Sequence, residues 1–304
     1  MKFGVNTFNF VSPFRTAADL PLLDRVKSMG FDLIEIAFED PATIDVAALA
    51  DYAAALDLGV LACGVFGPGR NLVSADAAER RAAAGYIRGL IDAAAQLAPT
   101  LSGATLSGAT LGGMIPVVGG PMYGAVGKTP AADRDARQRE RDLAAAELRP
   151  LAAYAGERGV RLAMEALNRF ETDLINVVDQ GLAMVEAIGS PHVGLHLDTF
   201  HMHLEEQDSG EAIRRAGERL YHFHACENDR GVPGRGQVRW PAVAIALDDI
   251  GYGRDGRDGF VVIESFTPEV TSIARAVCIW RDVAPDQDTI AREGLGFLRK
   301  MLAR

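Results

Sequence analysis

The chain contains 304 residues, of which 48% are hydrophobic and 24% charged, with a formal net charge of -10 at pH 7. This composition supplies enough apolar material for a sizeable core and excludes a disordered chain. Because Lys and Arg are dispersed among more numerous acids, the charge argues against a surface for nucleic acid or for an anionic membrane, and it favours a small neutral molecule as the partner.

Short apolar strands alternate with long helical stretches along the chain. Residues 2–6 predict a first strand and not the extended apolar core of a signal peptide, and no apolar run is long enough to span a bilayer. Further strands are expected at 32–37, 60–65, either 101–106 or 115–122, 160–166, 193–199, 220–226 and 260–265. Helices are expected near 17–29, 44–57, 75–97, 132–157, 176–188, 208–219 and 240–249, with a last helical region from 270 to 302.

Glycines support this order because they stand between a helical stretch and the next strand. Gly30, Gly59, Gly159 and Gly189 occupy such places, and glycine adopts the left-handed position after a helix at little cost. About eight such units predict one closed (β/α)8 TIM barrel domain over residues 1–304, with an open doubly wound sheet as the alternative. The first strand is not followed by Gly-x-Gly-x-x-Gly, which weakens the dinucleotide-binding version of that alternative.

Two local duplications predict loop insertions. Leu-Ser-Gly-Ala-Thr occurs twice in succession from residue 101, and a Gly-rich stretch follows it, so one insertion is expected near 101–127. A repeated Gly-Arg-Asp predicts the second insertion near 253–259. Duplications of this kind are tolerated best in surface loops, so we assign no function to them.

The three cysteines are Cys63, Cys226 and Cys278. Their odd number and wide spacing argue against a disulfide framework and favour a reducing compartment. We therefore expect a cytoplasmic protein.

Four of the expected strands end in a residue that can bind a metal. These residues are Glu165, Asp198, His224 and Glu264, at separations of 33, 26 and 40 residues that match successive barrel repeats. Each alone would be explained better as a cap, a surface partner or a core residue, but the C-terminal ends of barrel strands meet at one face, so the four together predict one site. Three carboxylates and an imidazole suit Mn²⁺, Mg²⁺ or Co²⁺ better than a structural zinc ion.

All six histidines lie between positions 192 and 224, which directs attention to the sixth and seventh strands. By the period of two along a strand, His196 shares a face with Asp198, and His222 shares one with His224. The later residue of each pair is expected nearer the catalytic mouth of the barrel.

Four runs around these residues resemble the ketose 3-epimerases, the D-tagatose, D-psicose (D-allulose) and L-ribulose 3-epimerase group of the xylose isomerase-like TIM barrel superfamily. The runs are EALNRFE at 165–171, LDTFHM at 197–202, HFHACENDRG at 222–231 and VIESF at 262–266. General similarity extends over nearly the whole chain.

The resemblance implies specific roles. Glu165, Asp198, His224 and Glu264 would hold one divalent metal ion, with Mn²⁺ favoured over Mg²⁺ and Co²⁺, and Glu165 and Glu264 would also form the catalytic acid/base pair. The resemblance further implies that Glu171, His201 and Arg230 bind hydroxyl groups of a free ketose. Phe266 is expected on the same strand face as Glu264, where it would pack against the sugar.

The implied reaction inverts C3 of the ketose through an enediolate. By analogy with the same group, a homodimer or homotetramer is expected. An aldose–ketose isomerase related to hydroxypyruvate or xylose isomerase is the alternative, and a dehydratase acting on a cyclic polyol is a further one. An endonuclease IV-like nuclease and a non-catalytic sugar-binding protein are disfavoured by the acidic charge and by the retained ligand set, respectively.

Overall fold

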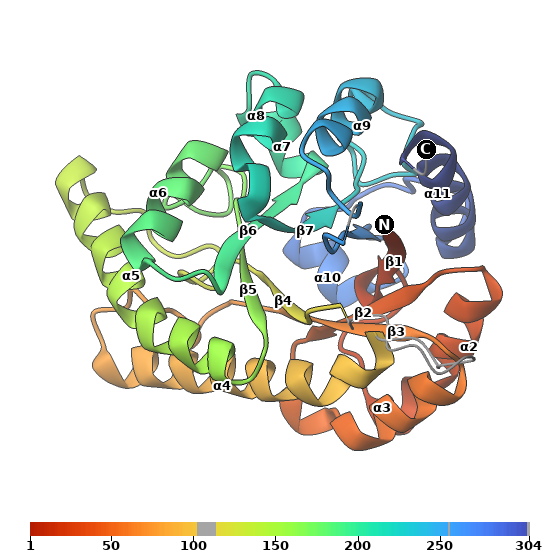
Figure 1. Cartoon of the computed structure of the whole chain (residues 1–304), viewed down its shortest axis with the longest axis horizontal. Helices are drawn as coiled ribbons and strands as arrows, with labels where there is room; N and C mark the ends of the chain where they lie inside the picture. The colour runs from red at the N-terminus through yellow and green to blue at the C-terminus, as the bar shows by residue number, and fades with distance from the viewer. Residues whose placement is uncertain (102–113, 255, 303–304) are drawn as a thin grey trace.

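A computed structural model describes residues 1–101, 114–254 and 256–302. Eight parallel strands close into a barrel in chain order, and β1 pairs with β8 (Figure 1). The strands are β1 (Lys2–Asn6), β2 (Leu33–Phe38), β3 (Gly59–Gly64), β4 (Val117–Gly120), β5 (Arg161–Glu165), β6 (Val193–Asp198), β7 (Leu220–His224) and β8 (Phe260–Ile263). The prediction of a closed (β/α)8 barrel is therefore confirmed, and the open sheet is excluded.

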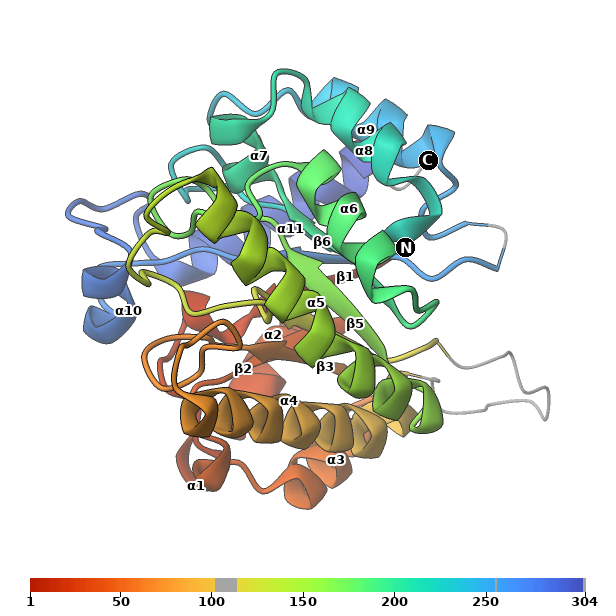
Figure 2. The same ribbon diagram turned by 90° about the vertical axis from the view of Figure 1, so that its left-hand side faces the viewer.

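Helices surround the strands on the outside of the barrel (Figure 1). They are α1 (Thr16–Asp19), α2 (Pro21–Ser28), α3 (Val46–Ala55), α4 (Ala77–Leu97), α5 (Arg134–Glu157), α6 (Val178–Ile188), α7 (Thr199–Glu205), α8 (Ser209–Ala216), α9 (Trp240–Asp249), α10 (Thr271–Ala276) and α11 (Gln287–Leu302). The two longest, α4 and α5, lie side by side (Figure 2). Each begins after an aspartate, Asp76 or Asp133, whose side chain accepts a hydrogen bond from a backbone N–H of the first turn.

Several expected helices differ from the observed ones. The stretch 17–29 divides into α1 and α2 because Pro21 starts a new helix. The region 270–302 divides into α10 and α11, and the stretch 208–219 ends as a helix at Ala216. Helix α7 was not expected, since the sixth strand was predicted to continue into residue 199.

Three of the four connecting glycines adopt the expected left-handed conformation, with φ of 95° at Gly30, 67° at Gly159 and 73° at Gly189. The expectation for Gly59 is wrong: Gly59 is the first residue of β3, and Asp57, with a φ of 49°, takes the left-handed position before it. The chain therefore turns two residues earlier than the glycine suggested.

The fourth strand lies in the later of its two expected positions, because β4 spans Val117–Gly120. The insertion predicted near 101–127 is thus not one continuous loop, and its residues 102–113 lie outside the described part of the chain. The second predicted insertion, near 253–259, forms turns between α9 and β8, with residue 255 outside the described part. Leu101 closes a short 3-10 helix, Ala98–Leu101, so a strand does not begin there.

The barrel interior changes from apolar to polar towards the C-terminal ends of the strands. His196, His222 and His224 pack together there, with ring centroids 4.1 to 4.9 Å apart. Strand β4, which pairs with β3 and β5, has a glycine at this level, and a Cβ on Gly119 would lie only 3.0 Å from His222 Cδ2. Gly119 therefore leaves the space that the imidazole rings occupy.

Among the helices of the described residues, none is long and apolar enough to cross a membrane.

Candidate active site

Four strands bring their ends to one buried point. Glu165, Asp198 and His224 are the last residues of β5, β6 and β7, and Glu264 directly follows β8. One ligand atom from each residue lies within 4.8 Å of the others, and all four side chains are buried. The structure therefore brings together all four residues that the sequence singled out as metal ligands.

The chemistry of this cluster fits a divalent cation. Three buried carboxylates would repel one another without positive charge between them, and burial of such groups is costly unless they are paired or bound to metal. Oxygen donors with one imidazole nitrogen match the preference of Mn²⁺ or Mg²⁺. This arrangement could hold a metal ion.

Arg230 extends from the loop after β7 across the edge of this cluster. Its Nη1 donates to Asp198 Oδ2 at 2.7 Å and to Glu264 Oε2 at 3.0 Å. Its guanidinium carbon lies 4.0 Å from the ring centroid of Phe200 and 4.8 Å from that of Phe266. The arginine is thus fixed by two carboxylates and two aromatic faces.

Phe266 does not lie on a strand, because β8 ends at Ile263. The prediction that it shares a strand face with Glu264 is therefore wrong. Its buried ring instead packs against Phe8, with centroids 5.8 Å apart, and against the face of Arg230. Phe200 lies on the other side of Arg230. Apart from its position beside His201, nothing in the sequence singled it out.

His201 and Glu171 are linked through Asn168. The backbone N–H of Asn168 donates to His201 Nδ1 at 3.1 Å, and its side-chain amide donates to Glu171 Oε1 at 2.7 Å. Burial, and then the charge of Arg230, lower the pKa of His201 well below its usual range, so the ring is neutral. Because Nδ1 accepts a hydrogen bond from a backbone N–H, we assign the ring proton to Nε2, which is 3.7 Å from both Glu165 Oε1 and Asp198 Oδ2 and 3.3 Å from Arg230 Nη2.

The two glutamates of the cluster differ in their affinity for a proton. Burial raises the pKa of Glu165 well above its usual range, and the neighbouring Glu264 raises it further. Burial would raise the pKa of Glu264 as well, but His224 and Arg230 outweigh burial and lower it.

A fourth buried acid at this cluster, Glu35 in the middle of β2, was missed in the sequence. Its Oε2 lies 2.7 Å from His224 Nε2 and accepts a hydrogen bond from the Asn6 amide at 2.7 Å, while its Oε1 lies 2.7 Å from His222 Nε2. Burial alone would raise the pKa of Glu35, but His224 and His222 outweigh it and hold that pKa below its usual range. The available signal was a carboxylate inside the apolar run LIEIAF at 33–38, whereas Glu165 and Glu264 were identified because each ends an apolar run.

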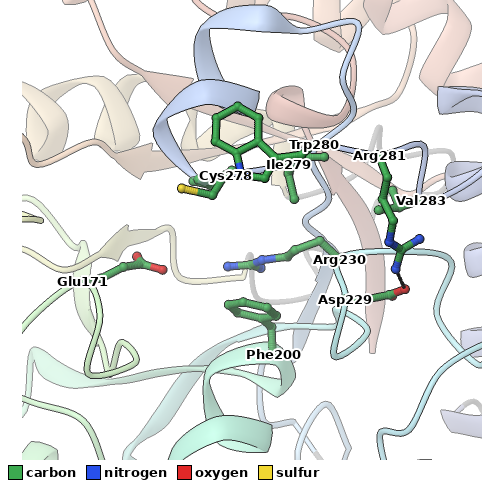
Figure 3. A pocket seen from close by; sticks show the side chains of 10 residues that line it. Glu171, Phe200, Asp229, Arg230, Cys278, Ile279, Trp280, Arg281 and Val283 are labelled. Atoms are coloured by element: carbon green, nitrogen blue, oxygen red, sulfur yellow. Dashed lines mark hydrogen bonds and ion pairs between the residues drawn. The ribbon is translucent and has the colours of Figure 1, made fainter.

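A cavity of about 280 Å³ opens at the mouth beside these residues (Figure 3). Arg230 points towards Glu171 across it, above the ring of Phe200, and the segment 277–283 forms the facing wall. Trp280 in that wall is 73% exposed. The volume suits a small molecule and not a polymer.

Comparison with known proteins gives consistent matches over almost the whole chain. Residues 23–301 match the xylose isomerase-like TIM barrel family. The D-psicose 3-epimerase of Agrobacterium fabrum is 33% identical over 293 residues, which cover 93% of each chain. The L-ribulose 3-epimerase of Mesorhizobium japonicum is 33% identical over 300 residues, which cover 98% of this chain and 93% of that protein.

Solved structures agree with this. The D-allulose 3-epimerase of Methylomonas sp. in complex with D-allulose superposes with a TM-score of 0.85 at 29% identity, covering 99% of this chain and 97% of that one. A structure of L-ribulose 3-epimerase gives a TM-score of 0.86 at 31% identity, with 99% and 94% covered. The chain therefore belongs to the xylose isomerase-like TIM barrel family and, within it, to the ketose 3-epimerase group of isomerases.

Proposed function

We propose that this protein is a metal-dependent ketose 3-epimerase that acts on free ketoses. The observation that carries the proposal is the buried convergence of Glu165 and Glu264 with Asp198 and His224, directly beside Arg230. Relatives named for activity on D-psicose and L-ribulose support the substrate class. The catalytic role of the two glutamates is part of this proposal.

Inversion at C3 requires removal of a proton from the carbon beside the C2 carbonyl and delivery of a proton to the opposite face. One glutamate accepts the C3 proton while the electron pair of the C–H bond moves towards the carbonyl, and the other glutamate returns a proton. A divalent cation held by Glu165, Asp198, His224 and Glu264 would supply Lewis-acid polarisation of the substrate oxygens. The two glutamates come from β5 and from the end of β8, which are not neighbours in the barrel.

The remaining side chains would bind and orient the sugar. His201 presents its Nε2–H, Arg230 presents its guanidinium, and Glu171 presents a carboxylate that accepts hydrogen bonds from hydroxyls. Phe200 and Phe266 hold Arg230 in one orientation, so its donors are preorganised for the substrate. Phe266 does not line the cavity, so in this proposal it acts on the sugar through Arg230.

The test is incubation of metal-stripped protein with D-fructose, D-tagatose, D-psicose and L-ribulose, with and without Mn²⁺, followed by chromatography of the products. We expect a metal-restored C3 epimer from at least one ketose. Formation of an aldose would instead identify an aldose–ketose isomerase. No turnover of any ketose would contradict the proposal and return attention to a dehydratase, a nuclease or a binding protein.

Four further attributes belong to the proposal. We propose Mn²⁺ as the native metal, because it accepts mixed carboxylate and imidazole ligands. The protein would be one functional domain, cytoplasmic and homo-oligomeric, as a dimer or tetramer. Metal analysis of the purified protein tests the metal, cell fractionation tests the location, and light scattering tests the oligomeric state.

A further inference from the structure

We infer that Glu35 is a positioning residue for the metal site: it fixes the tautomer and orientation of His224 so that Nδ1 of this ring is presented to the metal. The inference rests on the proposed function, since it concerns the same metal. Glu35 lies on β2, on the opposite side of the barrel from β6. The four candidate ligands lie on β5, β6 and β7 and directly after β8.

The side chain of Glu35 is completely buried inside the barrel. A carboxylate in such a place is costly unless donors surround it, and each of its oxygens has a polar neighbour at 2.7 Å. These neighbours are the Asn6 amide and the Nε2 atoms of His222 and His224. Glu35 is therefore held through hydrogen bonds to Oε2 from Asn6 and His224, while Oε1 lies close to His222 Nε2 without hydrogen-bond geometry.

The orientation of Asn6 determines which partner donates. Asn6 Oδ1 accepts a hydrogen bond from the backbone N–H of Phe8 at 2.9 Å, so the amide nitrogen is the atom that faces Glu35. Glu35 Oε2 thus already accepts one hydrogen bond when His224 Nε2 approaches it at 2.7 Å. An ionised carboxylate only accepts hydrogen bonds, so the proton of this contact belongs to His224 Nε2.

A neutral imidazole with its proton on Nε2 has a free lone pair on Nδ1. In His224 this atom faces the cluster, 3.6 Å from Glu264 Oε2. Metal-binding histidines are commonly held by a carboxylate at the other ring nitrogen, and loss of that carboxylate typically weakens metal binding by about 10- to 100-fold. Glu35 occupies the place where such a carboxylate belongs.

The first experiment compares Glu35→Gln with wild type by calorimetric titration of the metal-stripped full chain with Mn²⁺. Glutamine keeps the size of the side chain, but it has one acceptor oxygen and places an N–H₂ group against other donors. We expect a dissociation constant for Mn²⁺ about 10- to 100-fold higher than that of wild type, with an unchanged circular dichroism spectrum.

The matched control is Glu39→Gln. Glu39 follows the same strand β2, and its carboxylate accepts a hydrogen bond from Ser12 Oγ at 2.8 Å instead of contacting an imidazole. We expect this variant to bind Mn²⁺ as wild type does. Equal weakening in both variants would mean that loss of any carboxylate near this strand end disturbs the site, which would overturn the specific role of Glu35.

A second measurement needs no variant and so does not depend on how Glu35→Gln folds. Long-range ¹⁵N–¹H NMR of the wild-type protein, labelled at histidine and saturated with diamagnetic Mg²⁺, reports the tautomer of each of the six rings. We expect the proton of His224 on Nε2. A proton on Nδ1 would overturn the inference.

The outcomes separate this inference from the proposed function. If wild type binds Mn²⁺ and Glu35→Gln binds it equally well, the positioning role is wrong and the epimerase proposal stands. If wild type binds no divalent metal, both fail. If metal binding follows the expectation but no ketose is turned over, the positioning role stands and the activity has to be sought elsewhere.

Discussion

Arg230 is the residue whose side chain joins the metal cluster to the cavity. We expect Arg230→Lys to lower kcat/KM by about 100-fold, because an ammonium group cannot contact Asp198 and Glu264 and also stack between two rings, and hydrogen bonds to charged groups contribute about 1.5–3 kcal/mol. Steady-state kinetics with the preferred ketose checks this. Retention of wild-type kcat/KM would show that a point charge suffices there.

Glu165 and Glu264 make a separate prediction, because each is proposed to serve one epimer. In deuterium oxide, Glu165→Gln and Glu264→Gln should each lose most of the turnover, by at least about 10²-fold, while retaining C3 deuterium exchange with only one of the two epimers. Mass spectrometry of both sugars measures the exchange. Metal content is measured in parallel, since either substitution also removes a candidate ligand. Equal exchange from both epimers in both variants would contradict the two-base assignment.

The residues of this site differ in how well the sequence alone predicts them. Glu165, Asp198, His224 and Glu264 were predicted because each ends an apolar strand, and barrel geometry brings such ends together. Glu35 was missed because it lies inside a strand, where the sequence offers no partner for it. Its partners are 29 and 189 residues away in the chain, a relation that only the folded barrel creates.

At the scale of elements, the loop between β7 and α9 depends on one buried acid. Glu227 Oε1 accepts hydrogen bonds from the backbone N–H of Gly234 at 2.8 Å and from Trp240 Nε1 at 2.6 Å, and Oε2 accepts from Val238 N–H at 3.3 Å. The same loop carries Arg230, whose backbone adopts a left-handed φ of 61°. Glu227 therefore shapes the loop that positions the arginine.

We expect Glu227→Gln to raise KM several-fold and to lower the free energy of unfolding by about 1–3 kcal/mol, because one oxygen is replaced by an N–H₂ group facing other donors. Kinetics and denaturant unfolding measure the two effects. The exposed Glu218→Gln serves as the control and should change neither. A loss of stability with unchanged KM would separate the loop from substrate binding.

Asp173 ties the segment before α5 to the loop after β5. Its Oδ1 lies 2.7 Å from Lys128 Nζ, and its Oδ2 accepts from the backbone N–H of Ala131 at 2.8 Å. Burial would raise its pKa, but Lys128, Ala131 and Arg137 outweigh burial and lower it. The ionised form is therefore favoured in the folded state.

Because the folded-state pKa of Asp173 is lowered, its contribution to stability is complete above the unfolded-state value of about 3.9 and disappears as the pH falls through the folded-state value. We expect Asp173→Asn to lose on the order of 1 kcal/mol at neutral pH, since the group is partly exposed. Denaturant unfolding of both proteins between about pH 3 and pH 7 checks this. A stability difference that persists unchanged at the acid end would rule out the ion pair as its cause.

The elements themselves were predictable where the apolar period was uninterrupted, as in α9, expected at 240–249 and observed at Trp240–Asp249. The predicted ends of helices and strands were wrong where a single residue favoured a different local structure from the apolar pattern around it. Pro21 divided one helix, and Asp198 capped the unexpected α7 with its own side chain while also serving the cluster. A residue that ends a strand, caps a helix and faces a site carries three roles that a strand pattern cannot separate.

For the whole molecule, metal binding is expected to stabilise the fold, because the four candidate ligands converge only in the closed barrel. At a free Mn²⁺ concentration about 100 times the dissociation constant, linkage predicts about 2.7 kcal/mol, which corresponds to a rise of several degrees in Tm. Calorimetry with Mn²⁺, and then with excess chelator, measures the rise and its reversal. An unchanged Tm would contradict tight binding to the native state.

The pairing of β1 with β8 places residues 6 and 35 inside the same cluster as residues 165 to 264. During synthesis, Asn6 and Glu35 therefore leave the ribosome long before any candidate ligand does, and Glu35 has no imidazole partner until β7 is made. A shortened chain that lacks β1 and β2 would keep every ligand but lose the carboxylate behind His224. Strong metal binding by a newly made chain would therefore indicate that β1 and β2 have joined the strands that carry the ligands.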